Sequence, residues 1–422
     1  MEGWKHDKFK NQIQYKSGYT WSKEQELRIQ EPNAVRVLTV TNVQKELDLK
    51  EELYLKDVSE KDKVDKAVSK DWCIAVSSNG NRKRIGNAVF IKDDTDYLFA
   101  SFLTAFRPKP NSEIIPEFFF RWLSSHYIQE RLTSVSEGTT GLGNLDIRFL
   151  RNLDIYFPDK HVQTAIANIL STVDEAIASV HNSIAAAERL KKSLMQNLLT
   201  GKMKPDGTYR TPDEFYIDEK FGKVPTGWEV KRIKDFGEIQ TGKTPPTDEP
   251  EVFSDKENGF MFITPGDLDV AKYIEETERY VSEKGIRYSY VLPKGSVCEV
   301  CIGSTIGKIG ITTAKCCSNQ QITSVIVNNE HDAEYLYYAM LSRREHFKSV
   351  AGINATPQIN KSGYSKYRVL CPKDKLEQIA IAKGISSVDK SINEQKQKIE
   401  SLELLKKSLM QNLLTGKVVI DI

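Results

Sequence analysis

The segment GEIQTGKT, residues 237–244, matches the phosphate-binding pattern GxxxxGK[ST]. Such a loop binds phosphate only where the lysine and the threonine begin a helix whose free backbone N–H groups face the anion. Pro245 and Pro246 follow at once, and an acidic loop comes after them, so a helix is not expected to continue from Lys243. The alternative function of a P-loop ATPase is therefore disfavoured.

A second pattern has the spacing of a metal-dependent nuclease. Pro205-Asp206 is followed by Asp218-Glu219-Lys220, in which the carboxylates would hold a metal ion and the lysine would polarise the attack. These residues lie in a segment rich in glycine, proline and threonine, whereas that chemistry needs ligands on adjacent strands of a sheet. A nuclease acting on its own is the other disfavoured alternative.

Cysteine and histidine patterns give no metal site either. Cys298-x-x-Cys301 lies in a strand-like run, where positions three apart point to opposite faces, and Cys316-Cys317 lacks the usual two-residue spacer. The six histidines show no metal-ligand spacing. The sequence predicts no metal, no cofactor and no catalytic residue in this chain, and the few cysteines fit a reducing compartment.

Composition sets broad limits. A chain of 422 residues with 39% hydrophobic and 28% charged residues is typical of a soluble protein of two or three domains. No run approaches the roughly 20 apolar residues of a membrane span, so we expect a cytoplasmic protein. The formal net charge is only +2, and contact with nucleic acid would therefore depend on local basic clusters or on a partner.

The chain contains a long internal repeat. The segment LKKSLMQNLLTGK occurs at residues 190–202 and again, unchanged, at residues 405–417. The similarity extends backwards at a constant offset of 215, which pairs Val173-Asp174 with Val388-Asp389. Repeats of this kind indicate two copies of one structural module.

Each copy has the apolar spacing of a coiled-coil helix, in alternating steps of four and three residues. Gly201 and Gly416 are suited to the left-handed residue that ends a helix. Each helix should have about 40 residues and a length of about 60 Å, and the two should pair in antiparallel fashion. The repeating positions are Ile166, Leu170, Val173, Ile177, Val180, Ile184 and Ala187 in the first copy, and Ile381, Ile385, Val388, Ile392, Gln395, Ile399 and Leu402 in the second.

The segments before the helices also correspond. Trp4 precedes Gly18 of SGYT by fourteen residues, and Trp228 precedes Gly242 of TGKT by fourteen. Tyr19 takes the position of Lys243, which suits a loop with variable contacts and does not suit nucleotide hydrolysis. Each half thus reads as short strands with a few helices, followed by one long helix.

Two globular parts alternating with two long helices, the GW and TGKT motifs, and helix ends in LLTGK together make the chain resemble the specificity subunits of type I restriction-modification enzymes. The resemblance covers essentially the whole chain. It implies an internally duplicated α+β fold, with two target-recognition domains and two helices paired as an antiparallel coiled coil. The expected boundaries are 1–157 and 211–371 for the target-recognition domains, and 158–210 and 372–422 for the helices with the linker.

The resemblance further implies that the chain binds double-stranded DNA at an asymmetric bipartite target and is itself not catalytic. Two methyltransferase subunits would dock on the helices, and restriction or translocase subunits would join the complex. S-adenosylmethionine, ATP and Mg would then belong to the partner subunits. The expected docking residues are Leu190, Leu194, Leu198, Leu405, Leu409 and Leu413. A protein-binding coiled-coil adaptor without DNA remains an alternative.

Polar loops between the expected strands are the candidates for reading DNA, because loops on a rigid scaffold can vary without disturbing the core. Asn and Arg suit base edges, and Lys and backbone N–H groups suit phosphate. In the first half the candidates are Ser17, Gly18, Tyr19, Thr20, Asn79, Asn81, Arg82, Lys83, Arg84, Thr139, Thr140 and Asn144. In the second half they are Thr241, Gly242, Lys243, Thr244, Ser304, Thr305, Lys308, Asn319, Gln320, Gln321, Asn354, Thr356 and Gln358.

Overall fold

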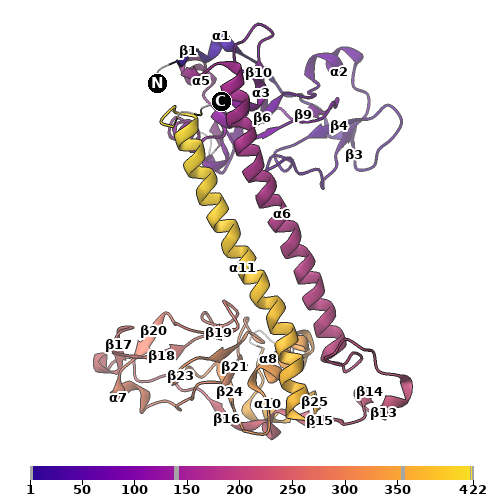
Figure 1. The fold of residues 1–422 in the computed structure, drawn as a ribbon, viewed down its shortest axis with the longest axis vertical. Helices are drawn as coiled ribbons and strands as arrows, with labels where there is room; N and C mark the ends of the chain where they lie inside the picture. Colours follow the sequence, from indigo (N-terminus) through magenta and orange to yellow (C-terminus); the bar gives the residue numbers. More distant parts are fainter. Residues whose placement is uncertain (1–2, 137–141, 353–356, 419, 421–422) are drawn as a thin grey trace. The chain divides into compact units, whose positions relative to one another are not determined.

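The computed structural model describes residues 3–136, 142–352, 357–418 and 420 (Figure 1). The chain divides into two units, which we call unit 1 (residues 1–182 and 397–422) and unit 2 (residues 183–396). Two long helices, α6 (Lys160–Leu198) and α11 (Lys375–Leu413), each contribute one part to each unit. Both have 39 residues, as the repeat predicts.

Unit 1 is built on two small sheets. The first packs with the helices in one core, and the second also has a smaller core of its own, which includes Val35, Leu55 and Leu98. Strands β4 and β9 pair in parallel, and the other neighbours in these two sheets are antiparallel. The first sheet has the order β2 (Ile13–Ser17), β10 (Leu103–Pro108), β6 (Cys73–Val76), β8 (Ala88–Phe90). The second has the order β3 (Glu26–Leu27), β5 (Tyr54–Leu55), β4 (Val35–Leu38), β9 (Leu98–Phe99). Two further pairs are β1 (Lys5–Lys8) with β12 (Asp154–Phe157), and β7 (Ser78–Asn79) with β11 (Gly143–Asn144).

Unit 2 repeats the order of these two sheets, and its larger sheet carries one further strand at an edge. Its parallel pair of β18 and β23 corresponds to that of β4 and β9. The larger sheet has the order β16 (Gly237–Thr241), β24 (Ile322–Val327), β21 (Val297–Val300), β22 (Ile309–Thr312), β19 (Tyr273–Ile274). The smaller has the order β17 (Phe253–Ser254), β20 (Arg279–Val281), β18 (Phe260–Ile263), β23 (Cys316–Ser318). The remaining pairs are β15 (Trp228–Arg232) with β25 (Arg368–Pro372), and β13 (Phe215–Asp218) with β14 (Gly222–Pro225).

The short helices follow the same duplication in chain order. A short helix comes after the two sheets of each half, then a second short helix, then a third that leads into the last strand before the long helix. The short helices of unit 1 are α1 (Phe9–Gln12), α2 (Glu60–Lys66), α3 (Pro116–Leu123), α4 (His126–Ser134) and α5 (Ile147–Asn152), of which the last three form this series. The short helices of unit 2 are α7 (Glu283–Ile286), α8 (Ala333–Ser342), α9 (Arg344–Val350) and α10 (Lys361–Lys366), and again the last three form the series.

Within each unit, the parts of α6 and α11 run in opposite directions. In unit 1, Ile166 and Leu170 of α6 share a core with Met410 and Leu413 of α11, while Asp174, later in α6, pairs with the earlier Lys406. Unit 2 has the same order at the other ends of the helices, where Leu198 shares a core with Ile381 and Lys191 pairs with Asp389. The predicted antiparallel pairing is confirmed in each unit. All the predicted seam positions are buried or half-buried.

Both long helices end three residues before the predicted glycines, at Leu198 and Leu413. Gly201 has a φ of 65° and Gly416 a φ of 63°, so both occupy the left-handed region that ends helices. After Gly201, the N–H of Met203 donates to the carbonyl of Asn197, and after Gly416 the N–H of Lys417 donates to the carbonyl of Asn412. Within the described residues, no helix carries an apolar stretch of the length that a membrane crossing requires.

Candidate nucleic-acid and subunit interfaces

The SGYT and TGKT motifs are one structural feature present twice. In unit 1 the Gly18 N–H donates to the Leu103 carbonyl, at the end of β2. In unit 2 the Gly242 N–H donates to the Ile322 carbonyl, at the end of β16. A Cβ on Gly18 would lie 2.0 Å from the Ala100 carbonyl oxygen. Glycine is therefore needed because a neighbouring backbone segment passes close by.

The same constraint excludes a phosphate-binding loop at this place. A Cβ on Gly242 would lie 2.1 Å from the carbonyl oxygen of Asn319, and the Lys243 N–H donates to the carbonyl of Ser318 at 2.9 Å. The lysine N–H is thus part of a backbone hydrogen bond, and residues 242–246 form no helix. Neither the free N–H groups nor the helix N-terminus of a P-loop is present.

The carboxylates of the nuclease-like pattern stabilise turns. Asp206 accepts hydrogen bonds from the backbone N–H and the hydroxyl of Thr208, and Asp218 accepts from the N–H groups of Lys220 and Phe221. All six cysteines are free and buried, and burial raises the pKa of Cys298 to about 12. In the part of the chain that the structure describes, no cluster of His, Cys, Asp or Glu could hold a metal ion.

In unit 1 the structure brings two of the predicted DNA-reading segments together. Asn79 of β7 pairs with Gly143 of β11, next to the exposed Arg82 and Lys83. The Arg84 guanidinium instead donates to two backbone carbonyls, so it is held inside the unit. Asn81 and Asn144 belong to the same group. Ser17 is the last residue of β2, and Tyr19 and Thr20 follow it. Thr139 and Thr140 lie outside the described residues.

In unit 2 two pairs of predicted segments lie side by side. Thr244 donates from its hydroxyl to Gln320, which joins residues 241–244 to residues 319–321. Ile302 forms a β-bridge with the exposed Gln358, next to Ser304 and Thr305. Lys308 donates to the Pro265 carbonyl, and Asn319 and Gln321 bond to each other, so these polar groups already have partners. Asn354 and Thr356 lie outside the described residues. DNA contact at all these residues stays a prediction.

The predicted docking leucines differ in how much surface they expose. Leu190 is 51% exposed and Leu405 47% exposed, at equivalent positions of the repeat. Leu194 and Leu409 are half-buried against the cores, and Leu198 and Leu413 are each 4% exposed. Leu198 and Leu413 anchor the long helices within their units. Leu190 and Leu405 therefore leave by far the most surface for a partner.

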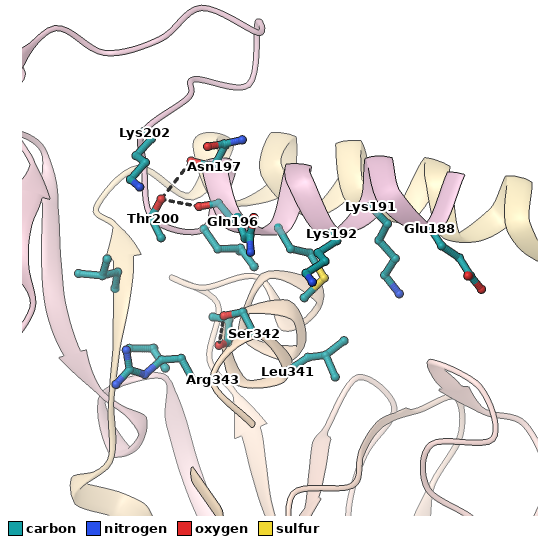
Figure 2. A pocket seen from close by; sticks show the side chains of 15 residues that line it. Glu188, Lys191, Lys192, Gln196, Asn197, Thr200, Lys202, Leu341, Ser342 and Arg343 are labelled. Carbon is teal, nitrogen blue, oxygen red and sulfur yellow. Dashed lines mark hydrogen bonds between the residues drawn. The ribbon is translucent and has the colours of Figure 1, made fainter. Parts of the chain in front are cut away.

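A groove of about 820 Å³ lies within unit 2, beside the end of α6 (Figure 2). Its apolar lining comes from α6, α8 and β25, and cationic side chains lie along it, among them Lys191, Lys192 and Arg343. Figure 2 shows the two lysines on the side of α6 that faces Leu341. The groove is lined on the α6 side by residues of the repeated segment, which recur unchanged at the end of α11.

An acidic residue joins three elements in each unit. In unit 1, Asp174 of α6 accepts from Arg121 of α3 and pairs with Lys406 of α11 at 2.6 Å. Burial alone would raise the pKa of the Asp174 carboxyl, but the Lys406 hydrogen bond and the Arg121 charge outweigh burial and lower that pKa. The sequence pairs Asp174 with Asp389 through the repeat, but it gives no sign of the contact with the globular part.

The equivalent junction in unit 2 uses a hydroxyl in place of the guanidinium. Asp389 of α11 accepts from the Tyr338 hydroxyl of α8 at 2.7 Å and pairs with Lys191 of α6 at 2.5 Å. A buried glutamine lies near the start of each long helix, and Gln163 and Gln378 both donate to the carbonyl of a preceding proline. The two units therefore fix their long helices at equivalent positions, with arginine in unit 1 replaced by tyrosine in unit 2.

Comparison with known proteins assigns both halves of the chain to one family. Residues 1–189 and 225–404 match the family model described as the type I restriction modification DNA specificity domain. The HindI specificity subunit of Haemophilus influenzae is 24% identical over 393 residues, which cover 79% of this chain and 84% of that protein. The MjaVIII specificity subunit of Methanocaldococcus jannaschii is 27% identical over 68% of this chain and 67% of that protein.

Solved structures show the same fold. The S subunit of the type I restriction-modification system from M. genitalium aligns with a TM-score of 0.59 at 16% identity, over 97% of this chain and 96% of that one. A chain from a structure that describes complex assembly and conformational transition of the type I R-M system aligns with a TM-score of 0.58 at 14% identity, over 99% of both. With two matched domains that together span most of its length, the chain belongs to the type I restriction modification DNA specificity family.

Proposed function

We propose that this chain reads a bipartite, asymmetric DNA sequence, with unit 1 recognising one half and unit 2 the other. The single observation that carries the proposal is the duplication of the sheet order in two units whose loops differ in sequence. A common framework fixes how each half presents its loops, and unlike loops contact unlike bases. Three or four base pairs per unit would give discrimination of about 4–10 kcal/mol.

The long helices set the number of unread base pairs in this proposal. A helix of 39 residues is about 58 Å long, which corresponds to about 17 base pairs at about 3.4 Å each. Joining two short half-sites makes a sequence that is rare in a genome, whereas a single half-site would recur too often.

The helix ends are proposed to hold two modification subunits, one at each copy of the repeated segment. The exposed Leu190 and Leu405 occupy equivalent positions, and the twelve residues that follow each of them are identical in both copies. Identical surfaces suit two copies of one partner. Methyl transfer and ATP-driven translocation and cleavage would reside in the partner subunits, with S-adenosylmethionine, ATP and Mg bound there, and the complex would act on DNA in the cytoplasm.

Domain exchange tests the proposal directly. Residues 1–157 are replaced by the corresponding part of another family member, and the methylated sites are sequenced in a host that carries the complete system. We expect one half of the methylated sequence to change while the other half and the spacer stay the same. A change in both halves, or in neither, would contradict the division of reading between the units.

Footprinting of the assembled complex separates DNA reading from a role as a protein adaptor. Two protected patches with an unprotected gap are expected from bipartite reading. An adaptor that binds only proteins would give no protection that depends on this chain. We expect no ATP turnover by the isolated chain, because Lys243 forms no phosphate-binding loop, whereas a P-loop ATPase would show turnover that Lys243→Ala abolishes.

A further inference from the structure

Two cationic side chains of unit 1 lie over the ring of one tryptophan, and the charge of a third, Lys66, acts on one of them. Lys16 of β2 has its Nζ 4.5 Å from the centre of the Trp72 ring, and Arg107 of β10 has its Cζ 4.6 Å from that centre. Lys66, at the end of α2, donates to the carbonyl and the hydroxyl of Ser17 at 3.2 and 3.3 Å. Trp72 itself is only 7% exposed, and Lys16 and Arg107 beside it are half-buried.

The register of the sheet explains the cluster. Lys16 lies opposite Ala105 of β10, and Arg107 lies two residues further along the same face. Cys73 of β6 lies opposite Phe106, so Trp72 comes into line with Arg107. Residues far apart in the sequence therefore meet on one face of three adjacent strands.

The positive charges have no carboxylate partner. Lys16 donates to the carbonyl of Ala67, Lys66 to Ser17, and Arg107 lies over the aromatic ring. Within the described residues, none of the three cations forms an ion pair. The pKa of Lys16 is lowered to about 8, mainly by burial and then by the charges of Arg107 and Lys66. Only the charge of Asp65 raises it. Bound anionic oxygen would relieve this repulsion.

Unit 2 shows that the fold does not need these cations. The same register places Gln240 at the position of Lys16, because Gln240 lies opposite Ser324 as Lys16 lies opposite Ala105. The position of Arg107 is taken by Ile326, and that of Trp72 by Ser296. The cluster is thus specific to unit 1, although four strands of this sheet have the same order in both units.

We propose that Lys16, Lys66 and Arg107 bind a backbone phosphate of the DNA that unit 1 reads, an inference that rests on the proposed function. The cluster adjoins Ser17 and Gly18, where β2 ends, and Lys66 is bonded to Ser17 itself. A phosphate held there would set the position of the duplex against the loop of residues 17–20. Contacts of this kind fix register and orientation but do not select bases.

The test measures how the affinity of the assembled complex for DNA depends on salt and on pH. Lys16→Gln, which installs the residue found in unit 2, and Lys66→Gln should each lower the slope of log affinity against log salt by about one. Binding should weaken to a similar extent for cognate and unrelated duplexes. Lys61→Gln, an exposed lysine of the same helix α2, is the matched control and should leave the slope unchanged.

The pH dependence adds a readout that a merely structural lysine would not change. A bound phosphate favours the protonated form of Lys16, so binding depends on that proton. The affinity of the wild-type complex for DNA should therefore fall from pH 7 to pH 9, by up to about tenfold per pH unit above the pKa that Lys16 has without DNA. Lys16→Arg should bind at pH 7 and lose most of that fall, since arginine stays charged. Slopes unchanged in both glutamine variants, or an equal fall in Lys16→Arg, would overturn the phosphate site. A wild-type complex that binds no DNA would overturn the proposed function instead.

Discussion

Asp174 and Lys406, on two different long helices of unit 1, form an ion pair with 2.6 Å between Oδ1 and Nζ. The same pair recurs in unit 2 as Asp389 and Lys191, with the acid and the base exchanged between the helices. The exchange follows from the repeat, because both residues of the pair shift by 215 positions. One contact between the helices thus appears twice, each time next to a globular part.

Replacement of Asp174 by Asn should destabilise unit 1 at neutral pH by about 1–3 kcal/mol, the usual worth of hydrogen bonds to a charged group. The lowered pKa of Asp174 means that its contribution is present above the ordinary carboxyl pKa and is lost as pH falls through the folded value. The difference between wild type and variant should therefore shrink below about pH 4. Unfolding in urea at several pH values measures this difference. Glu394→Gln, which removes a surface pair with a 3.8 Å separation, should have little effect.

Gly18→Ala and Gly242→Ala should each destabilise their own unit. The added methyl group would lie about 2 Å from a backbone carbonyl oxygen, which must move, and overpacking of this kind costs about 1–3 kcal/mol. Gly80→Ala is the control, because nothing lies within 4 Å of the Cβ at that position. Thermal unfolding of the three variants should show two destabilised proteins and one close to wild type. Equal stability of all three would contradict the close approach of the backbones.

Glu299→Gln should stabilise unit 2 at alkaline pH. Glu299 of β21 is 1% exposed, and burial raises the pKa of its carboxyl to about 8. The folded state therefore holds a proton that the unfolded state releases above about pH 4.5, so stability falls as pH rises from there towards pH 8. The glutamine side chain does not titrate, so the stability of the variant should depend less on pH. Its free energy of unfolding should exceed that of the wild type by about 2–4 kcal/mol at pH 8. Unfolding curves between pH 5 and pH 9 provide the measurement, and the exposed Glu257→Gln should keep the wild-type slope.

Leu190→Asp and Leu405→Asp should each remove one of two modification subunits from the purified complex. Both side chains are about half exposed, so a charge there disturbs a partner surface more than the core of this chain. The mass of the complex should fall by one partner copy in each single variant and by two in the double variant. Leu376→Asp changes a leucine that is 73% exposed outside the repeated segment and should leave the mass unchanged. Full assembly of the double variant would refute docking at the helix ends.

Much of the fold was predictable because it depends on local patterns. The apolar spacing predicted both long helices, and the repeated TGK sequences predicted the left-handed glycines that follow their ends. The correspondence of Gly18 with Gly242 also held, since both make the same backbone hydrogen bond. These features need only short stretches of sequence, in which spacing and glycine act directly on the backbone.

The long-range contacts could not be predicted in this way. Asp174 meets Arg121 and Lys406 only because three segments fold together, and the cations around Trp72 meet only through strand register. Arg84 was a candidate for reading DNA, but its guanidinium bonds to carbonyls of residues that precede it by about forty positions. Composition alone does not distinguish an arginine that contacts solvent from one that stabilises a loop.

The thirteen identical residues at the two helix ends also limit how this protein can evolve under the proposed docking. A modification subunit that must fit both ends cannot adapt to a substitution at one end without losing its fit at the other. Substitutions in the loops of either unit face no such double requirement. New DNA specificities can therefore arise in one half of the chain while the assembly of the complex is inherited unchanged.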